Sequence, residues 1–143
     1  MSIAAYKRTI RESESPRQIE VRVFTRITGN LRKHLNDYEA AQNREDRSRI
    51  LADGLRHALI ENQKLWIALR DDLAGSGNQL PAQLRAQLLS IALWTHRQTS
   101  QVLGGNPGLR ALVDVNANIL AGLSRAQPQA VTSDGTQSYA QTV

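Results

Sequence analysis

Residues 55–73 read LRHALIENQKLWIALRDDL, and the spacing of their apolar side chains decides the fold class. Side chains at intervals of three and four residues share one face of an α-helix, and this alternation is typical of a helix packed at a shallow angle on its neighbours. We therefore predict a helix over about 46–73. Gly54 should weaken it by up to about 1 kcal/mol relative to alanine without interrupting it. The positions that share the face are Leu55, Leu59, Asn62, Trp66, Leu69 and Leu73.

The residues before this segment predict a first helix. Ser15 and Pro16 are typical of a helix start, because serine caps a helix and proline suits its first position. We expect this helix to run to about residue 40, after a short polar arm over residues 1–14. Its expected buried face carries Phe24, Ile27, Leu31, His34 or Leu35, and Tyr38, with Ile19 and Val23 extending it toward the start.

The residues after the segment predict two more helices. AGSGN at 74–78 has the composition of a loop, and Pro81 begins a third helix that runs to about residue 103, before Gly104. Asn106 and Pro107 repeat the cap-and-proline pattern and begin a fourth helix. The expected buried positions are Leu84, Leu88, Ile91, Thr95 and Val102 on the third helix, and Leu109, Leu112, Asn116, Ile119 and Leu123 on the fourth.

Length and composition complete the fold prediction. A chain of 143 residues suggests one domain, and abundant Leu, Ala, Arg and Gln favour helices. After residue 124 the sequence has no periodicity and few apolar residues, so we expect a disordered tail. The predicted fold is all-α: a small four-helix bundle, antiparallel because its loops are short, in a single domain over 1–123, with a short N-terminal arm and a tail over 124–143.

No catalytic, cofactor-binding or metal-binding motif is present. The three histidines fall on three different predicted helices without ligand spacing, and the chain has no cysteine. Asp71 and Asp72 are adjacent, so on a helix they diverge by about 100° and suit a solvated helix end better than a catalytic dyad. We therefore expect no enzymatic activity, no cofactor and no metal.

Charge and hydropathy bear on location and partners. The N-terminus has no apolar signal region, and no apolar run reaches the roughly 18 residues that cross a bilayer. We expect a cytoplasmic protein without membrane insertion. Residues 1–72 carry 25 charged side chains, whereas residues 73–143 carry six, so the last two helices have unusually uncharged outer faces.

One uncharged stretch in this second half predicts a partner-binding surface. AQLLSIALWTH at 86–96 lies between Arg85 and Arg97. Its core face is accounted for by Leu88, Ile91 and Thr95, so the remaining apolar side chains are in excess of one bundle seam. Together with the facing part of the second helix they form the predicted surface: Leu65, Trp66, Leu69, Leu89, Leu93 and Trp94. Trp66 is also explained as a core residue, and Trp94 as one buried against the arm or the first helix.

Two polar patterns leave alternatives open. Arg22, Arg26 and Lys33 lie on one face of the first helix and form either a solvated face or a stripe that contacts RNA phosphates. Asn62 and Asn116 each interrupt an apolar seam, and a buried amide is costly unless it is hydrogen-bonded. They either bond across the bundle, to each other or to backbone, and fix its register, or lie at its margin.

The ordered set of segments resembles a known family. SPRQIEVRVF at 15–24, ALIENQKLWIALRDDLA at 58–74, LPAQLRAQLLSIALW at 80–94 and VDVNANILAGL at 113–123 resemble the FlaF family, small flagellar proteins of alphaproteobacteria. The resemblance covers roughly residues 5–123.

The resemblance implies a cytoplasmic protein of flagellum assembly with no enzymatic activity or cofactor. Members of the family are associated with binding flagellin, as an export chaperone does, and with tuning flagellin synthesis beside the regulator FlbT. Flagellin is therefore the expected partner and a FlbT-type regulator a second one. The alternative function is post-transcriptional regulation of flagellin mRNA through Arg22, Arg26 and Lys33. Nucleic-acid binding is the less favoured expectation, and the sequence does not decide whether the chain self-associates.

Overall fold

The computed structural model describes residues 16–126, and this part of the chain contains helices and no strand. The predicted arm and nearly all of the predicted tail lie outside the described residues, as does Ser15. The elements are α2 (Pro16–Arg32), α3 (Leu35–Ala40), α4 (Arg44–Ile50), the π-helical turn η1 (Leu51–Leu55), α5 (Arg56–Ala74), α6 (Ala82–Leu103) and α7 (Leu109–Ala126).

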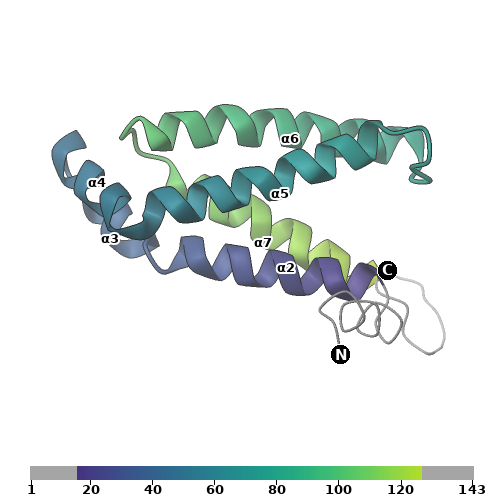
Figure 1. The fold of residues 1–143 in the computed structure, drawn as a ribbon, viewed down its shortest axis with the longest axis horizontal. Helices are drawn as coiled ribbons and strands as arrows, with labels where there is room; N and C mark the ends of the chain where they lie inside the picture. The colour runs from purple at the N-terminus through teal and green to yellow at the C-terminus, as the bar shows by residue number, and fades with distance from the viewer. Residues whose placement is uncertain (1–15, 127–143) are drawn as a thin grey trace, which may run out of the picture.

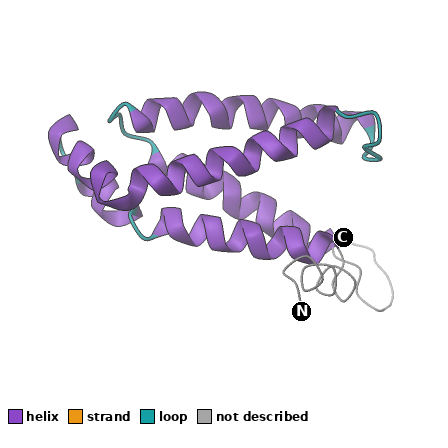
Figure 2. Cartoon of the chain, in the orientation of Figure 1, coloured by secondary structure: helices purple, strands orange, loops and turns teal. Residues whose placement is uncertain are grey.

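The four long helices, α2, α5, α6 and α7, form the predicted antiparallel bundle (Figures 1 and 2). Helix α5 packs chiefly on α6, α2 packs chiefly on α7, and α2 also packs on α5. The short helices α3 and α4 lie across one end, which we call the closed end (Figure 1). The opposite end, where α2 begins, α7 ends and the α5–α6 loop lies, is called the open end. The all-α, four-helix prediction is thus confirmed.

The first predicted helix is broken near its end. The backbone N–H of His34 donates to the carbonyl of Leu31 at 3.1 Å, a three-residue turn that separates α2 from α3. This change of direction carries α3 across the closed end, where Leu35 and Tyr38 are buried against the other helices. The prediction of one helix to residue 40 was therefore wrong, although Phe24, Ile27, Leu31 and Tyr38 of its predicted face are buried, with Leu35 rather than His34 in the core. Val23 is half-buried, and the side chain of Ile19 lies outside the described residues.

The second predicted helix is interrupted at Gly54, contrary to expectation. Asp53 leaves the helical region at φ −94° and ψ 29°, and Gly54 adopts φ 116°. A positive φ is accessible to glycine because it has no Cβ. The chain turns a corner there, so α4 lies across the closed end while Leu51 and Leu55, on either side of the turn, both remain buried.

The third and fourth helices match their predicted bounds closely. Helix α6 begins one residue after Pro81, and α7 begins at Leu109, two residues later than Asn106 and Pro107 suggested. Asn106 holds the loop instead of capping the helix. Its side chain accepts a hydrogen bond from Arg44 Nη2 at 2.7 Å and donates to Gln101 Oε1 at 2.7 Å.

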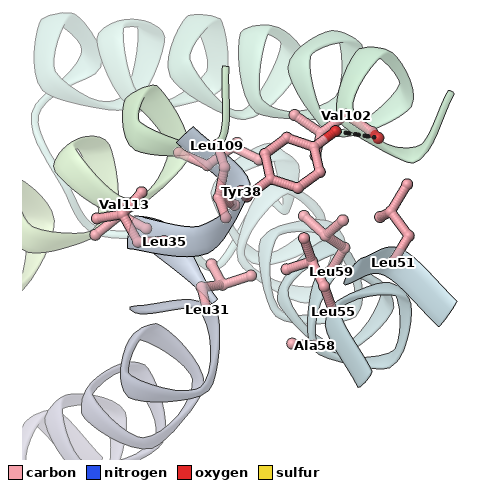
Figure 3. Close-up of a cluster of buried hydrophobic side chains, with 11 residues drawn as sticks. Leu31, Leu35, Tyr38, Leu51, Leu55, Ala58, Leu59, Val102, Leu109 and Val113 are labelled. Carbon is pink, nitrogen blue, oxygen red and sulfur yellow. Dashed lines mark hydrogen bonds between the residues drawn. The ribbon is translucent and has the colours of Figure 1, made fainter. Parts of the chain in front are cut away.

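A continuous apolar core fills the closed end, and Tyr38 ties it to the α6–α7 loop. Leucines from α2, α3, η1, α5 and α7 surround the Tyr38 ring (Figure 3). The Tyr38 hydroxyl lies 2.6 Å from the carbonyl oxygen of Asn106 and 3.1 Å from that of Val102. Arg47 Nε donates to the carbonyl of Gly105 at 2.7 Å, and Arg44 donates to that of Gly104. The Val102 carbonyl lies in the last turn of α6, where carbonyls have no partner within the helix. The other three carbonyls lie in the loop that follows, so these contacts hold the α6–α7 loop against α3 and α4.

Substitution of Gly54 tests the backbone conformation assigned to it where the chain turns between α4 and α5. Gly54→Ala is expected to lower the free energy of unfolding in urea by about 1–2 kcal/mol, because alanine is strained at φ 116°. Gly29→Ala is the matched control: Gly29 lies inside α2, a Cβ there meets nothing within 4 Å, and alanine should stabilise the helix by about 0.5–1 kcal/mol. Equal effects of the two substitutions would contradict the assigned conformation of Gly54.

The buried Tyr38 hydroxyl predicts that the stability of the fold depends on pH. Burial raises the pKa of Tyr38 above its ordinary 10.0, and Glu39 adds to this while Arg47 and Arg44 oppose it. A raised phenol pKa stabilises the fold fully below pH 10, and this stabilisation is lost as pH rises through the folded-state pKa. Tyr38→Phe should lower the free energy of unfolding at neutral pH by about 1–2 kcal/mol. The difference between the phenolate absorbance titrations of wild type and variant should have its midpoint above 10.0; a midpoint at or below that value would contradict the burial argument.

Candidate functional site

A layer of buried polar side chains crosses the middle of the bundle. Asn116 of α7 donates from Nδ2 to Asn62 Oδ1 of α5 at 2.7 Å and lies 3.1 Å from Thr28 Oγ1 of α2. Asn116 Oδ1 accepts from the indole N–H of Trp66 at 3.0 Å. Thr28, Asn62 and Asn116 are essentially inaccessible to solvent. Of the two readings of the seam asparagines, the bond across the bundle is confirmed. We call Thr28, Asn62 and Asn116 the polar layer.

The chemistry of Trp66 fixes how both amides are oriented. An indole N–H can only donate, so the group of Asn116 that faces it must be the carbonyl oxygen. The Asn116 NH₂ group therefore faces Asn62, which must present its own oxygen in return. This orientation leaves Asn62 Nδ2 buried with no hydrogen-bond partner among the described residues. The layer thus stabilises one arrangement of α2, α5 and α7 at the cost of one unsatisfied donor.

The polar layer separates two apolar clusters that differ in how completely their side chains are buried. Toward the closed end the cluster around Tyr38 is fully buried. Toward the open end the cluster has only Phe24, Trp66 and Ala92 as buried members, and the other apolar side chains packed against it are half-buried. Leu73, at the end of α5, is buried outside this cluster. Phe24 meets Trp66 edge to face, with ring centroids 5.9 Å apart and ring planes at 90°. Through this contact and the Trp66–Asn116 bond, the open-end cluster is held against the polar layer.

An apolar pocket of about 610 Å³ opens beside this cluster. Four long helices line it: α2 with Val23 and Phe24, α5 with residues between Leu65 and Leu73, and α6 and α7 with half-buried or exposed side chains. Leucine, isoleucine, valine, phenylalanine and alanine make up most of the lining. The side chains from α6 and α7 that the argument below uses are Leu84, Leu88, Ile119 and Leu123.

These pocket residues were predicted to be core. Leu84 has the correct helical position for the seam of α6, yet it is 41% exposed. Ile119 and Leu123, at the end of the α7 seam, are also incompletely buried. The seams therefore continue to the open end, but the helices there do not close over one another. The sequence signal that accompanies this is the scarcity of charge after residue 73.

Asp72 gives the pocket its charge. Of the described residues that line it, Asp72 alone is ionisable, and Asn78 and Asn118 are the other polar side chains. Asp72 Oδ2 accepts a hydrogen bond from Asn78 Nδ2 at 3.1 Å, and Asn78 Oδ1 accepts from the N–H of Leu80 at 3.0 Å. Asp72 therefore orders the α5–α6 loop, a role that the sequence did not suggest, whereas Asp71 lies exposed at the helix end as expected.

The predicted partner-binding residues divide into three groups. Leu65 and Leu69 line the pocket, and Trp66 is buried behind it at 2% exposure. Trp94 is half-buried against the closed-end cluster. Leu89 is half-buried and Leu93 is 53% exposed, and neither lines the pocket. The structure thus does not bring the six residues together on one surface.

The predicted RNA-contacting residues are all exposed, and the three histidines lie on different elements. Arg22 and Arg26 are exposed on α2, and Lys33 is exposed in the turn that follows it. His57 and His96 are exposed, and His34 is half-buried. Within residues 16–126 no three His, Cys, Asp or Glu side chains are grouped so that they could hold a metal ion. None of the helices in this range is long and apolar enough to span a membrane.

These features define a small antiparallel four-helix domain with a mostly apolar pocket at one end. The chain belongs to the FlaF family: it matches the family described as flagellar protein FlaF over residues 2–123. This is the family that the sequence resembles. No curated protein and no solved structure matches the chain.

The polar layer predicts an asymmetry between its two asparagines. Asn116→Leu removes the partner of Trp66 Nε1 and of Asn62 Oδ1, whereas Asn62→Leu removes the unsatisfied amide and leaves Asn116 bonded to Thr28 and Trp66. Asn116→Leu should therefore lower the free energy of unfolding by about 2 kcal/mol more than Asn62→Leu, measured by urea denaturation. Equal losses, or a larger loss for Asn62→Leu, would show that Asn116 is not the centre of the layer.

Proposed function

We propose that this protein binds flagellin, as a chaperone or adaptor that supports flagellin synthesis and export, and that the pocket at the open end receives an amphipathic helix of the client. The observation that carries the proposal is the pocket itself, a mostly apolar concavity in a member of a flagellar protein family. The segment expected to dock is one of the terminal segments of flagellin, which are amphipathic helices in the assembled filament.

The size and lining of the pocket suit an apolar helix face. Ligand pockets commonly have volumes of roughly 300–1,000 Å³, and the volume of about 610 Å³ lies within that range. Grooves that take an amphipathic helix bind anchor side chains at intervals of three and four residues. Leucines on α5 and α6, together with the end of α7, form an apolar wall of this kind. Among the described residues, only three polar side chains line the pocket, which disfavours a highly polar small ligand.

The incompletely buried apolar side chains at the open end supply the driving force for docking a helix. Covering an exposed leucine fully contributes about 1.5–3 kcal/mol. Leu84 is 41% exposed, and Leu88, Ile119 and Leu123 are half-buried, so a docked helix would remove apolar surface from water at several positions at once. At the closed end the core is already packed, so a docked helix would find fewer half-buried core side chains to cover there.

The alternative, regulation of flagellin mRNA by direct contact, would use Arg22, Arg26 and Lys33. Their exposure is compatible with phosphate contact, but no described aromatic side chain on their helix is exposed beside them for base stacking. The two functions differ in salt dependence, because phosphate contacts weaken steeply as salt rises and apolar contacts do not. A FlbT-type regulator is a further proposed partner, for which the pocket offers no separate argument.

Substitution of two leucines on α6 distinguishes flagellin binding at the pocket from binding elsewhere on the surface. Leu84→Asp places a charge at the pocket wall and should weaken flagellin binding by about tenfold or more. Leu93→Asp is the matched control: Leu93 is on the same helix and more exposed, at 53%, but does not line the pocket. The measurement is the dissociation constant for purified flagellin at two salt concentrations, with helix content checked by circular dichroism.

Three outcomes contradict the proposal. Undiminished binding by folded Leu84→Asp excludes the pocket as the flagellin site. Loss of binding by Leu93→Asp alone moves the site to the outer face of α6, which carries Leu89 and Leu93 of the sequence-predicted surface. The protein can also be purified from flagellated cells, with and without RNase treatment. If it then retains RNA without RNase but retains no flagellin in either case, the mRNA-binding alternative is supported.

A further inference from the structure

The segment that precedes α2 enters the fold beside the pocket. Helix α2 begins at Pro16, and Val23, which lines the pocket, follows seven residues later, about 10 Å along the helix axis. Ile10 lies six positions before Pro16, and an extended chain spans about 20 Å over six residue steps. Residues 1–15 can therefore reach the pocket without any rearrangement of the described helices.

The sequence of residues 1–15, MSIAAYKRTIRESES, has the pattern of an occupant of such a pocket. Ile3, Tyr6 and Ile10 are spaced by three and four residues, so in a helix they share one face. Lys7 and Arg11 lie beside that face, whereas Arg8 lies on the opposite side of such a helix. With Glu12 and Glu14, the segment carries three basic and two acidic side chains. An apolar stripe flanked by basic side chains matches an apolar pocket whose one ionisable lining residue, among those described, is an aspartate.

Charge complementarity at the end of α5 strengthens this match. Asp71 and Asp72 lie in the last turn of α5, where the helix macrodipole disfavours negative charge and favours a cation. Asp71 is exposed, and its side chain lies 3.5 Å from the adjacent Arg70. No lysine, arginine or histidine is among the described residues that line the pocket. A basic segment laid across this end would therefore meet an acidic rim.

The bounds of the family match distinguish the two ends of the chain. The match starts at residue 2 and so includes the segment before α2, and it stops at Leu123, which lines the pocket. The last twenty residues fall outside it. The N-terminal segment is therefore part of the family domain, and the C-terminal segment is not, which favours the former as the element that covers the pocket.

We propose that residues 1–15 are the intramolecular occupant of the open-end pocket and compete with its client. Ile3, Tyr6 and Ile10 enter the pocket as the apolar face of a helix, and Lys7 and Arg11 beside that face meet Asp71 and Asp72. The competition rests on the proposed flagellin-binding function, whereas the docking of the segment does not. A tethered segment acts at an effective concentration in the millimolar range, so the client must displace it, and its apparent affinity falls by the fraction of open pocket.

Disulfide trapping in the full chain tests the docking, because the chain has no native cysteine. The test variant carries Ile10→Cys with Leu84→Cys, at the pocket wall. The control carries Ile10→Cys with Leu93→Cys, which is more exposed but away from the pocket. Under mild oxidation we expect the intramolecular bond to form about tenfold faster in the test pair than in the control. Addition of Asp71→Asn to the test pair should slow it.

Equal rates in the two pairs would overturn the docking. Bonds formed between two chains, seen as a dimer on a non-reducing gel, would overturn it in favour of a second copy as the occupant. Intramolecular bonding that is fast only in the pocket pair supports it, whether or not flagellin binds.

The competition is tested separately, with the cysteine-free chain. The variant Ile3→Ser with Tyr6→Ser and Ile10→Ser should bind flagellin several-fold more tightly than wild type, and Lys7→Gln is the control for a change of charge alone. Unchanged affinity of the triple variant overturns the competition. If neither the wild type nor the variant binds flagellin, the proposed function fails, and the disulfide rates still decide where residues 1–15 lie.

Discussion

The amide of Asn116 is the interaction on which the arrangement of the bundle depends. It joins three helices, because its oxygen accepts from Trp66 of α5 and its nitrogen donates toward Asn62 of α5 and Thr28 of α2. Each of these groups is buried, so any shift of α7 along its axis would leave several of them without partners. Apolar seams alone tolerate such shifts, since leucine packs on leucine in more than one register. The hydrogen bonds select one register.

Helix α6 stands outside this network. Its buried threonines satisfy themselves, with Thr95 Oγ1 donating to the carbonyl of Ile91 at 2.8 Å and Thr99 Oγ1 to that of Thr95 at 2.7 Å. The helix is held by packing on α5 along its length and by the contacts of Tyr38, Arg44 and Arg47 at its C-terminal end. Its N-terminal half has neither the polar layer nor a closed core beneath it. The pocket lies where these restraints are absent.

The helices, their buried faces and the asparagine contact could be predicted from the sequence because periodicity and side-chain polarity are local signals. The breaks at His34 and Gly54 could not, since they depend on how α3 and α4 must turn to cover the closed end. Gly54 illustrates this: a glycine within a helical pattern indicates a weak point, and only the path of the chain shows that its φ is positive.

The pocket escaped prediction for a different reason. Spacing shows which side of a helix faces its neighbours, but not how far away those neighbours lie. Leu84, Leu88, Ile119 and Leu123 have the same spacing as the packed residues at the closed end, yet they line the pocket. Toward the open end the helices α5 and α6 draw away from α2 and α7 (Figure 1). Of the predicted partner-binding residues, Leu65 and Leu69 line the pocket, whereas Leu89, Leu93 and Trp94 of α6 do not.

The polar layer also divides the bundle into a closed end and an open end, on which selection can act separately. Folding relies on the closed end, with its buried leucines, Tyr38 and the loop contacts, while the residues that shape the pocket lie on the other side of the asparagines. Exchanges among leucine, isoleucine, valine and methionine at the pocket wall alter its contour without touching the amide contacts that set the register. Relatives with this architecture can therefore diverge in what they recognise while keeping the same scaffold.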